Sequence, residues 1–290
     1  MAGKFLRVKS WTAGGIGIYD LESDPRALRN TAFDSVHYDL PRAKIDVAHS
    51  SAMKRIPTLA ALKRELRKAA DPDRAGNLTW FKTGKGEYGE GDKFIGVSVP
   101  TQRAIAKKYH HLELDDIEKL LGSRIHEHRF TGVLILVAEY QAGDTSAKQR
   151  VFDFYLNHTR CMNNWDLVDT SAPYILGEHL IFRPRRILYC LAESSNLWER
   201  RIAMVATAAF IDRGDLKDAF AIAARLLADK RDLIHKAIGW MLREAGKHSR
   251  AEMIDFLKRN YSRMPRTALR YAIEHLPEAQ RKRALKGLFA

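Results

Sequence analysis

The sequence predicts an all-α protein built as a solenoid of paired helices, and three observations favour this class. After Pro100, apolar residues recur at the three- and four-residue steps of amphipathic helices, separated by short polar connectors. Runs of alternating polar and apolar residues, which would indicate strands, are nearly absent there. Basic and aromatic residues recur at intervals of 30 to 36 positions, which is typical of stacked helix pairs.

The first 52 residues have a different character from the rest of the chain. Glycines around Gly14 and the prolines Pro25 and Pro41 interrupt any helical period. Scattered acidic residues are atypical of a transit peptide. We therefore expect residues 1–52 to form an irregular arm outside the native fold and residues 53–290 to form the folded domain, with Met53 as a candidate native start.

The segment before Pro100 begins with one amphipathic helix, because Leu59, Leu62 and Leu66 recur on one helical face after Thr58. Trp80-Phe81-Lys82 and a glycine-rich tract over residues 83–93 follow. The tract does not match the G-x-x-x-x-G-K-[ST] phosphate-binding pattern. We expect a plain connector, and a loop that approaches phosphate remains the alternative.

Beyond Pro100 the pattern predicts a continuous series of helices joined by short turns such as Gly143-Asp144-Thr145. The predicted helices span residues 101–110, 114–122, 125–141, 146–159, 164–179, 184–193, 197–212, 215–228, 231–247, 249–260, 263–275 and 278–288. Each pair buries its apolar face only by stacking on its neighbours, so we expect one continuous core with a concave and a convex side.

The second helix of each pair carries one equivalent position, which we call a rung. Successive rungs are separated by 36, 36, 35 and 30 residues. They are Arg129, Trp165, Arg201, Lys236 and Arg266. Residues one turn later share a face with the rungs, and they are Val133, Asp169, Val205, Trp240 and Arg270. A closed core would be uniformly apolar at these positions, so the pattern predicts a concave basic groove.

Composition indicates the kind of partner that such a groove would bind. The chain has a formal net charge of +14 and a pI near 9.8, as expected of a protein that meets a polyanion. Cations suit phosphates and aromatic faces suit sugars or bases, so nucleic acid is the expected partner, and a merely solvated basic surface is the alternative.

Cysteine and histidine usage argues against a disulfide framework and a zinc site. Cys161 and Cys190 show no C-x-x-C spacing, which favours a reducing compartment and inert thiols. His126-Glu127-His128 lacks the i, i+4 histidine pair that would place two ligands on one helical face. We therefore expect surface histidines there and no metal.

Asp169 is the single carboxylate among the rungs and the positions one turn after them. A carboxylate that faces phosphates is repelled unless it performs a task that a cation cannot, such as stabilising a developing positive charge. Cleavage of a glycosidic bond develops such a charge on the sugar. The alternative is a structural salt bridge between Asp169 and Arg201.

Three motifs in order resemble the signatures of AlkD-like DNA alkylation repair enzymes. They are Asn164-Trp165-Asp166-Leu167-Val168-Asp169, Leu197-Trp198-Glu199-Arg200-Arg201-Ile202-Ala203 and Lys236-Ala237-Ile238-Gly239-Trp240-Met241-Leu242-Arg243-Glu244. The resemblance extends from about Ala61 to His275. It implies a HEAT-like repeat fold and a monofunctional glycosylase that needs neither metal nor organic cofactor. The implied substrates are N3- and N7-alkylated purines, such as 3-methyladenine and 7-methylguanine, in duplex DNA.

The resemblance also implies roles for individual residues. Asp169 matches the catalytic carboxylate, Trp165 and Trp240 match the aromatic pair that contacts the deoxyribose, and Arg201 matches the basic residue beside them. Two positions depart from the family pattern, because Trp80 replaces a tyrosine and Ser98 replaces a glutamine. On the N-terminal side of the site, Trp80 keeps an aromatic face without a hydroxyl, and Ser98 has a shorter polar reach.

The remaining candidate DNA contacts are mainly basic side chains. With Trp80 and Ser98 they are Lys82, Arg103, Arg129, Lys236, Arg243, Arg266 and Arg270. Asp166 points about 100° away from Trp165 around the helix, so we expect it to be structural. We expect a monomer that binds double-stranded DNA and no membrane. The rival hypothesis is a non-catalytic solenoid that binds nucleic acid or a phosphorylated partner.

Overall fold

The computed structural model describes residues 7–12, 15–20, 58–76 and 81–289. The chain divides into two compact units, Met1–Ile56 and Pro57–Ala290. Met53 and Trp80, both singled out from the sequence, lie outside the described residues.

The N-terminal unit contains a β-hairpin within the segment that we expected to be irregular. Strands β1 (Arg7–Thr12) and β2 (Gly15–Asp20) pair antiparallel, with Arg7 opposite Asp20 and Thr12 opposite Gly15. The signal for β2 is the alternation of the β-branched residues Ile16 and Ile18. We expected no strand here because the glycines suggested an irregular segment, and we overlooked this alternation.

The unit Pro57–Ala290 is helical, and among its described residues it has no strand, which confirms the predicted all-α class. Its α-helices are α1 (Leu59–Lys68), α2 (Pro72–Gly76), α3 (Val99–Lys108), α4 (Leu114–Leu121), α5 (His126–Ala142), α6 (Thr145–Asn157), α7 (Trp165–Ser171), α8 (Arg186–Ala192), α9 (Leu197–Ala206), α10 (Ala208–Ile211), α11 (Lys217–Leu226), α12 (Asp232–His248), α13 (Arg250–Asn260), α14 (Arg266–Ala272) and α15 (Glu278–Ala284). Short turns η4 (Thr159–Cys161), η5 (Pro173–Gly177) and η6 (Tyr261–Arg263) complete the unit. None of the described helices combines the length and the apolar character that crossing a membrane requires.

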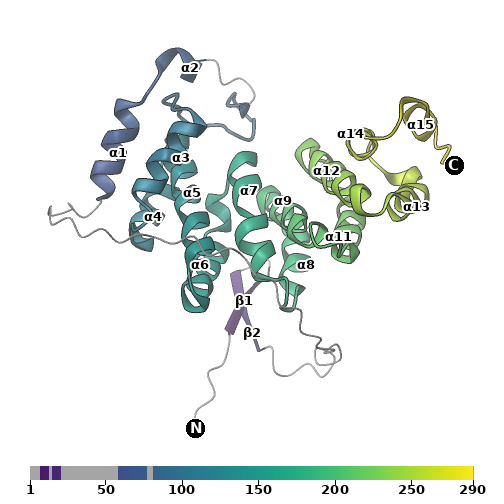
Figure 1. The fold of residues 1–290 in the computed structure, drawn as a ribbon, viewed down its shortest axis with the longest axis horizontal. Coiled ribbons are helices and arrows are strands. Elements are labelled where there is room, and N and C mark those ends of the chain that lie inside the picture. The colour runs from purple at the N-terminus through teal and green to yellow at the C-terminus, as the bar shows by residue number, and fades with distance from the viewer. Residues whose placement is uncertain (1–6, 13–14, 21–57, 77–80, 290) are drawn as a thin grey trace, which may run out of the picture. The chain divides into compact units, whose positions relative to one another are not determined.

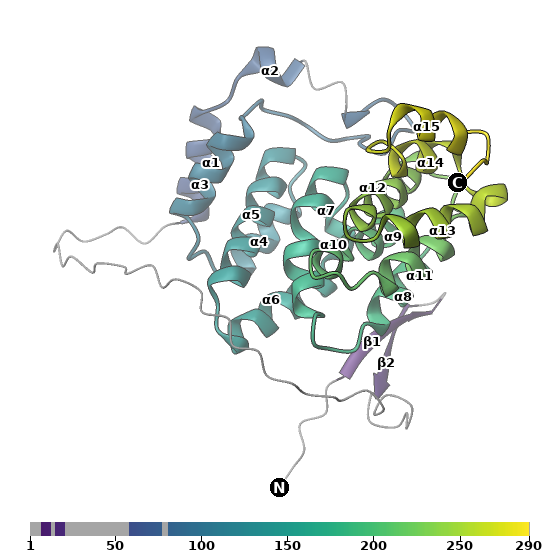
Figure 2. The same ribbon diagram turned by 45° about the vertical axis from the view of Figure 1, so that its right-hand side comes forward.

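The helices of this unit stack in chain order, as Figures 1 and 2 show. Helices α3, α5, α7, α9, α12 and α14 form a row in which each contacts the next, and α4, α6, α8, α11 and α13 pack against that row. Each rung lies within the first five residues of a helix in the row. The equivalence that the spacing predicted is therefore present in the structure.

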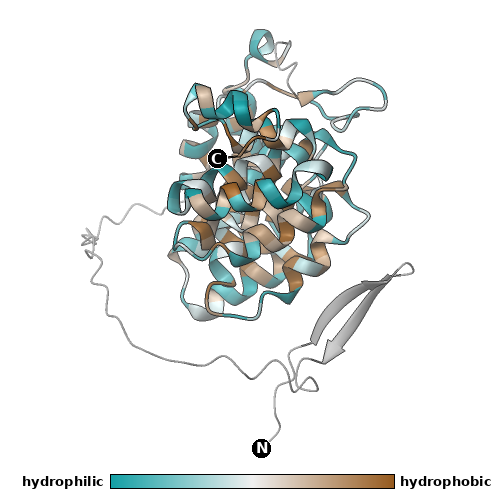
Figure 3. Ribbon diagram, turned by 90° about the vertical axis from the view of Figure 1, so that its right-hand side faces the viewer, coloured by the Kyte–Doolittle hydropathy of each residue, from teal (hydrophilic) through white to brown (hydrophobic). Residues whose placement is uncertain are grey.

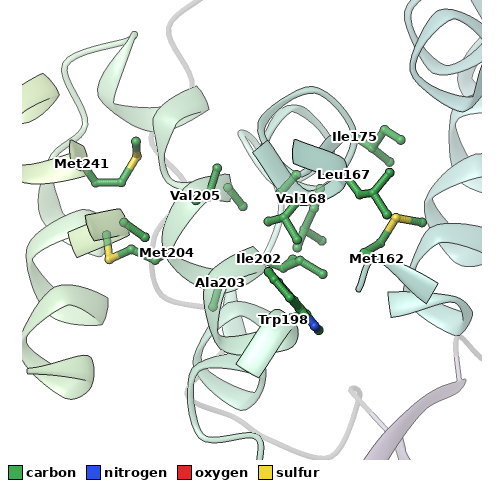
Figure 4. Packing of buried hydrophobic residues seen from close by; sticks show 14 of the residues in the cluster. Met162, Leu167, Val168, Ile175, Trp198, Ile202, Ala203, Met204, Val205 and Met241 are labelled. Atoms are coloured by element: carbon green, nitrogen blue, oxygen red, sulfur yellow. The ribbon is translucent and has the colours of Figure 1, made fainter. Parts of the chain in front are cut away.

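The core runs along the whole stack without a break. Between α7 and α9, Val168, Ile202 and Trp198 pack together, and Met204 and Met241 continue the core toward α12 (Figure 4). Apolar and polar residues alternate along the helical ribbons (Figure 3), as expected of amphipathic helices that bury one side.

Two predicted helices are interrupted where the sequence has a local reason. The helix expected over residues 164–179 gives way to a π-turn at Pro173, where Gly177 N–H donates to Ala172 O. The helix expected over residues 197–212 breaks at Thr207, whose hydroxyl donates to Met204 O at 2.7 Å. Both interruptions come after the rung, so the N-terminal ends of α7 and α9 stay regular.

Candidate active site

The first turn of α7 is fixed by a buried asparagine. Asn164 caps the helix, and its side-chain oxygen accepts from Trp165 N–H at 2.8 Å. Its amide nitrogen donates to Asp92 at 3.3 Å. This cap makes Trp165 the first residue of α7 and places Asp169 one turn later.

Asp169 and Arg201 form a bidentate ion pair between α7 and α9. Arg201 Nε donates to Asp169 Oδ1 at 2.9 Å, and Nη2 donates to Oδ2 at 2.7 Å. Arg201 Nη1 donates to Leu233 O on α12. The salt bridge that we considered as a structural alternative therefore exists, and through Arg201 it links the side chain of Asp169 on α7 to a main-chain oxygen of α12.

The carboxylate keeps acceptor capacity despite this pair. Each carboxylate oxygen has two lone pairs and Arg201 occupies one on each, so one on each remains for a sugar or a water. The Asp169 side chain is 19% exposed, whereas Arg201 is 6% exposed. Burial raises the pKa of Asp169, the Arg201 cation and its hydrogen bonds oppose that rise, and the net shift is upward.

A cleft of about 1430 Å³ opens beside this pair. Trp165, Asp166 and Asp169 lie along its α7 side, and Ser98 and Arg103 line its α3 side. Its walls also include Phe94, Phe130, Leu134 and Val137. The cleft thus places apolar surface and a few polar groups in front of the Asp169 carboxylate, an arrangement typical of ligand sites.

An aromatic cluster supports Trp165 from the N-terminal segment. The Phe81 ring stacks on Trp165 with centroids 5.4 Å apart and planes 17° apart. Phe81 also contacts Phe94 and His126, each at 4.8 Å between centroids. Sequence reasoning singled out the motif that contains Phe81 but gave the role to its neighbours Trp80 and Lys82.

Behind Trp165 lies a buried network of charged groups. Arg129 Nη2 bonds Asp92 Oδ2 at 2.7 Å, and His126 Nε2 bonds Asp166 Oδ2 at 2.7 Å. His126 Nδ1 also lies 3.3 Å from Arg129 Nη2. Burial alone would lower the pKa of His126, but the hydrogen bond to Asp166 and the Asp92 carboxylate, 3.7 Å from Nδ1, outweigh it and raise that pKa. Asp166 thus bonds His126 within this network and also lines the cleft.

The network corrects two expectations from the sequence. His126, Glu127 and His128 are buried, at 3%, 2% and 6% exposure, so the prediction of surface histidines is wrong. Glu127 accepts the Gly96 N–H at 2.7 Å, which holds the segment before α3. Arg129 is only 2% exposed, and Asp92 occupies its guanidinium, so it presents no group to a phosphate and leaves the set of candidate DNA contacts.

The other predicted residues that the structure describes do not line this cleft. Lys236 is partly exposed and pairs with Asp232 at 2.9 Å, and Trp240 is half-buried one turn later on α12. Arg243 lies toward the far end of α12, paired with Glu244 and Glu274, beside a separate cavity of about 340 Å³. Lys82, Arg266 and Arg270 are exposed, and Arg266 donates to Leu285 O at 2.7 Å.

The helical unit of the chain matches a known protein family. Residues 62–276 match the family model described as DNA alkylation repair enzyme. The chain belongs to this family. As a member of this family, the protein has a role in DNA repair, and its substrate is DNA. A search of curated proteins found no match.

Among the solved structures that match this chain, one illustrates the shared fold. It is described as a predicted DNA alkylation repair enzyme from Enterococcus faecalis, and it has 17% sequence identity and a TM-score of 0.57. The similarity covers 72% of this chain and 97% of the other. At this identity the likeness concerns the fold.

Proposed function

We propose that the protein is a monofunctional DNA glycosylase that hydrolyses the N-glycosidic bond of N3- and N7-alkylated purines in duplex DNA. The observation that carries the proposal is Asp169, held by Arg201 at the edge of the cleft and one turn from Trp165. Trp165 and Trp240 are proposed to contact the deoxyribose, and Lys236, Arg103, Arg266 and Arg270 to contact phosphates.

The chemistry of the substrate explains why one carboxylate suffices. An N3- or N7-alkylated purine carries positive charge and leaves readily, so no general acid is needed to protonate it. Only the sugar cation that forms needs stabilisation. The paired acid and base of ordinary glycoside hydrolases are therefore not required. A unit charge at ~4 Å and an effective dielectric of ~20 supplies about 4 kcal/mol, roughly a thousandfold in rate.

The positive charge of Arg201 reduces the stabilisation that Asp169 gives to the sugar cation. Arg201 also fixes the geometry of the carboxylate. A preorganised group costs no reorganisation when charge develops, and such groups dominate many active sites. Arg201 is therefore proposed to orient Asp169 so that its remaining lone pairs meet the sugar or the attacking water.

The test is incubation of purified protein with methylated duplex DNA, followed by quantification of released 3-methyladenine and 7-methylguanine. Asp169→Asn is expected to lower single-turnover release by about 100- to 1000-fold. Asp218→Asn is the matched control, because Asp218 also pairs with an arginine, Arg185, at 2.7 Å, and does not line the cleft. Intact abasic sites without strand breaks are expected as the DNA product.

The bidentate salt bridge also favours one alternative, a DNA-binding module that retains Asp169 only to hold Arg201. That module would bind methylated and unmethylated duplex equally and release no base. Base release that Asp169→Asn leaves unchanged would reject the mechanism proposed for this carboxylate.

A further inference from the structure

The His126 side chain lies where α5, α7 and the segment before α3 meet beside the candidate site. His126 is the first residue of α5, and its side chain is only 4% exposed. Its Nε2 lies 2.7 Å from Asp166 Oδ2 on α7. Its ring stacks on Phe94 and contacts Phe81, each with centroids 4.8 Å apart. His126 therefore joins α5 to α7 and to the segment that precedes α3.

Both of these connections lead to Trp165. Phe81, which contacts the His126 ring, also stacks on the indole of Trp165 with centroids 5.4 Å apart. Asp166 is the next residue along α7. Its Oδ1 accepts the Leu167 N–H at 2.9 Å, while its Oδ2 bonds His126. One carboxylate thus fastens the first turn of α7 to the start of α5.

The neighbours of the other ring nitrogen decide which nitrogen donates. His126 Nδ1 lies 3.3 Å from Arg129 Nη2 and 3.7 Å from Asp92 Oδ2. In the neutral ring Nδ1 accepts from Arg129, because a guanidinium has no acceptor, so the proton stays on Nε2. In the charged ring both nitrogens carry protons. Nε2–H therefore donates to Asp166 in either state of the histidine.

The orientation of the first turn of α7 matters because Trp165 and Asp169 both line the cleft. Trp165 begins the helix and Asp169 lies one turn later, so a frayed or rotated first turn displaces both side chains. A misplacement of about 1 Å near reacting groups can lower a rate by about 100-fold. The Asn164 cap acts on the backbone of Trp165, and the bond between His126 and Asp166 adds a restraint from a second helix.

We propose that His126 is a positioning residue of the candidate site, whose Nε2–H holds Asp166 and so fixes the first turn of α7. This turn carries Trp165 and leads into Asp169, so the bond keeps both side chains in the orientation that base release requires. The role rests on the glycosylase function proposed above. Asp166 then transmits the restraint from α5 to α7 and takes no part in the chemistry itself.

Two substitutions separate the donor from the ring. His126→Gln keeps an N–H donor at the end of the side chain, whereas His126→Phe keeps a ring and removes the donor. At saturating protein, His126→Phe is expected to lower the single-turnover rate of base release by about 10- to 100-fold. His126→Gln is expected to restore most of that rate. Binding to a duplex that contains a tetrahydrofuran abasic-site analogue is expected to stay unchanged, because the proposed phosphate contacts are left intact.

The matched control is His179→Phe, which removes the polar atoms of another buried histidine. His179 is 2% exposed, stacks on Phe152, bonds Tyr140 at 3.3 Å and does not line the cleft. This variant is expected to release base at the wild-type rate, at a temperature at which thermal unfolding shows every variant to be folded. A loss equal to that of His126→Phe would assign the effect to stability alone and overturn the proposal.

Fluorine NMR of protein labelled with fluorotryptophan gives a readout that does not depend on catalysis. The Trp165 resonance is assigned by its loss in Trp165→Phe. His126→Phe is expected to shift or broaden this resonance, and His179→Phe to leave it unchanged.

The outcomes separate the positioning role from the glycosylase function. An unchanged Trp165 resonance in His126→Phe, or base release by that variant at the wild-type rate, overturns the positioning role even where Asp169-dependent release persists. A His126→Gln variant as slow as His126→Phe overturns it as well. A shifted resonance in a protein that releases no base keeps the restraint on Trp165 and rejects the glycosylase.

Discussion

Asp169 and Arg201 each hold the other in place, so a substitution at either position changes both side chains. Arg201→Ala would leave a mostly buried carboxylate without its cation, and breaking a buried pair in this way costs about 3 to 5 kcal/mol of unfolding free energy. It would also remove the group that opposes the upward pKa shift of Asp169.

We therefore predict that Arg201→Lys, which keeps a charge but not the bidentate fork, moves the acid limb of base release to higher pH. The carboxylate form of Asp169 is required in the proposed mechanism, and a weaker partner lets it protonate earlier as the pH falls. The measurement is the single-turnover release rate between pH 4 and 8. An acid limb that coincides with wild type contradicts this role for Arg201.

A second prediction for a single residue concerns His126 and the pH dependence of stability. Its pKa is raised in the folded protein above the ordinary value of 6.5. Its ion pairs with Asp166 and Asp92 therefore stabilise the fold fully below about pH 6.5, and that stability is lost as pH rises through the folded pKa. His126→Gln is expected to flatten the fall of unfolding free energy between pH 6.5 and 9 in urea titrations. An equally steep fall in the variant would contradict this.

The residues that sequence reasoning misplaced share one physical cause. Arg129 fits the rung spacing, and its helix position is as expected, but its carboxylate partner Asp92 lies far away in sequence. Likewise the His126 ring, expected at the surface, contacts Phe81 and Phe94, which lie far from it in sequence. Spacing along a helix predicts which face a side chain occupies, but it does not reveal what another segment places against that face.

At the scale of helices, most boundaries were predictable because caps and breaks are local. Thr58, Asp144 and Ser249 cap α1, α6 and α13 with side-chain hydrogen bonds. The π-turn at Pro173 and the break at Thr207 were not predicted, because a continuous apolar pattern passes through both. Which helices approach most closely also had to come from the structure.

The tight contact between α12 and α14 gives a prediction for a single helix pair. A Cβ on Gly239 would lie 2.4 Å from Tyr271 Cβ and 2.5 Å from Ala268 O. Gly239→Ala is therefore expected to destabilise the protein by about 1 to 3 kcal/mol through overpacking. At Gly122 the nearest atom would be 3.6 Å away, so Gly122→Ala is the matched control with little loss. Chemical denaturation compares the two, and equal stabilities would contradict the packing account.

The net charge of +14 belongs to the whole molecule, yet its cations are not equivalent. Lys236 and Arg270 are accessible, whereas Arg129 is buried with Asp92. We predict that Lys236→Ala and Arg270→Ala each reduce the slope of log binding constant against log salt by about 0.9. Arg129→Met should leave that slope unchanged while lowering stability. Fluorescence anisotropy at several salt concentrations checks this, and a reduced slope for Arg129→Met would return that residue to the DNA footprint.

Acid stability is also a property of the whole fold, because two buried histidines lie in different repeats. Burial lowers the pKa of both His128 and His179 to about 4. Their stabilising neutral forms are present above about pH 6.5 and lost as pH falls toward 4, at a cost of about 3 kcal/mol each. His179→Phe, which can keep the ring stack on Phe152, is expected to flatten this loss in urea titrations from pH 7 to 4. An unchanged acid profile would contradict the assignment.

The guanidinium of Arg201 has a mechanical consequence. It holds a side chain of α7 and a main-chain oxygen of α12 at the same time, so α7, α9 and α12 cannot hinge apart without breaking one of those bonds. Solenoids usually bend by small rotations between adjacent repeats. Here the middle of the stack is expected to move as a rigid block, and any flexing that accommodates a curved DNA helix is left to the repeats on either side.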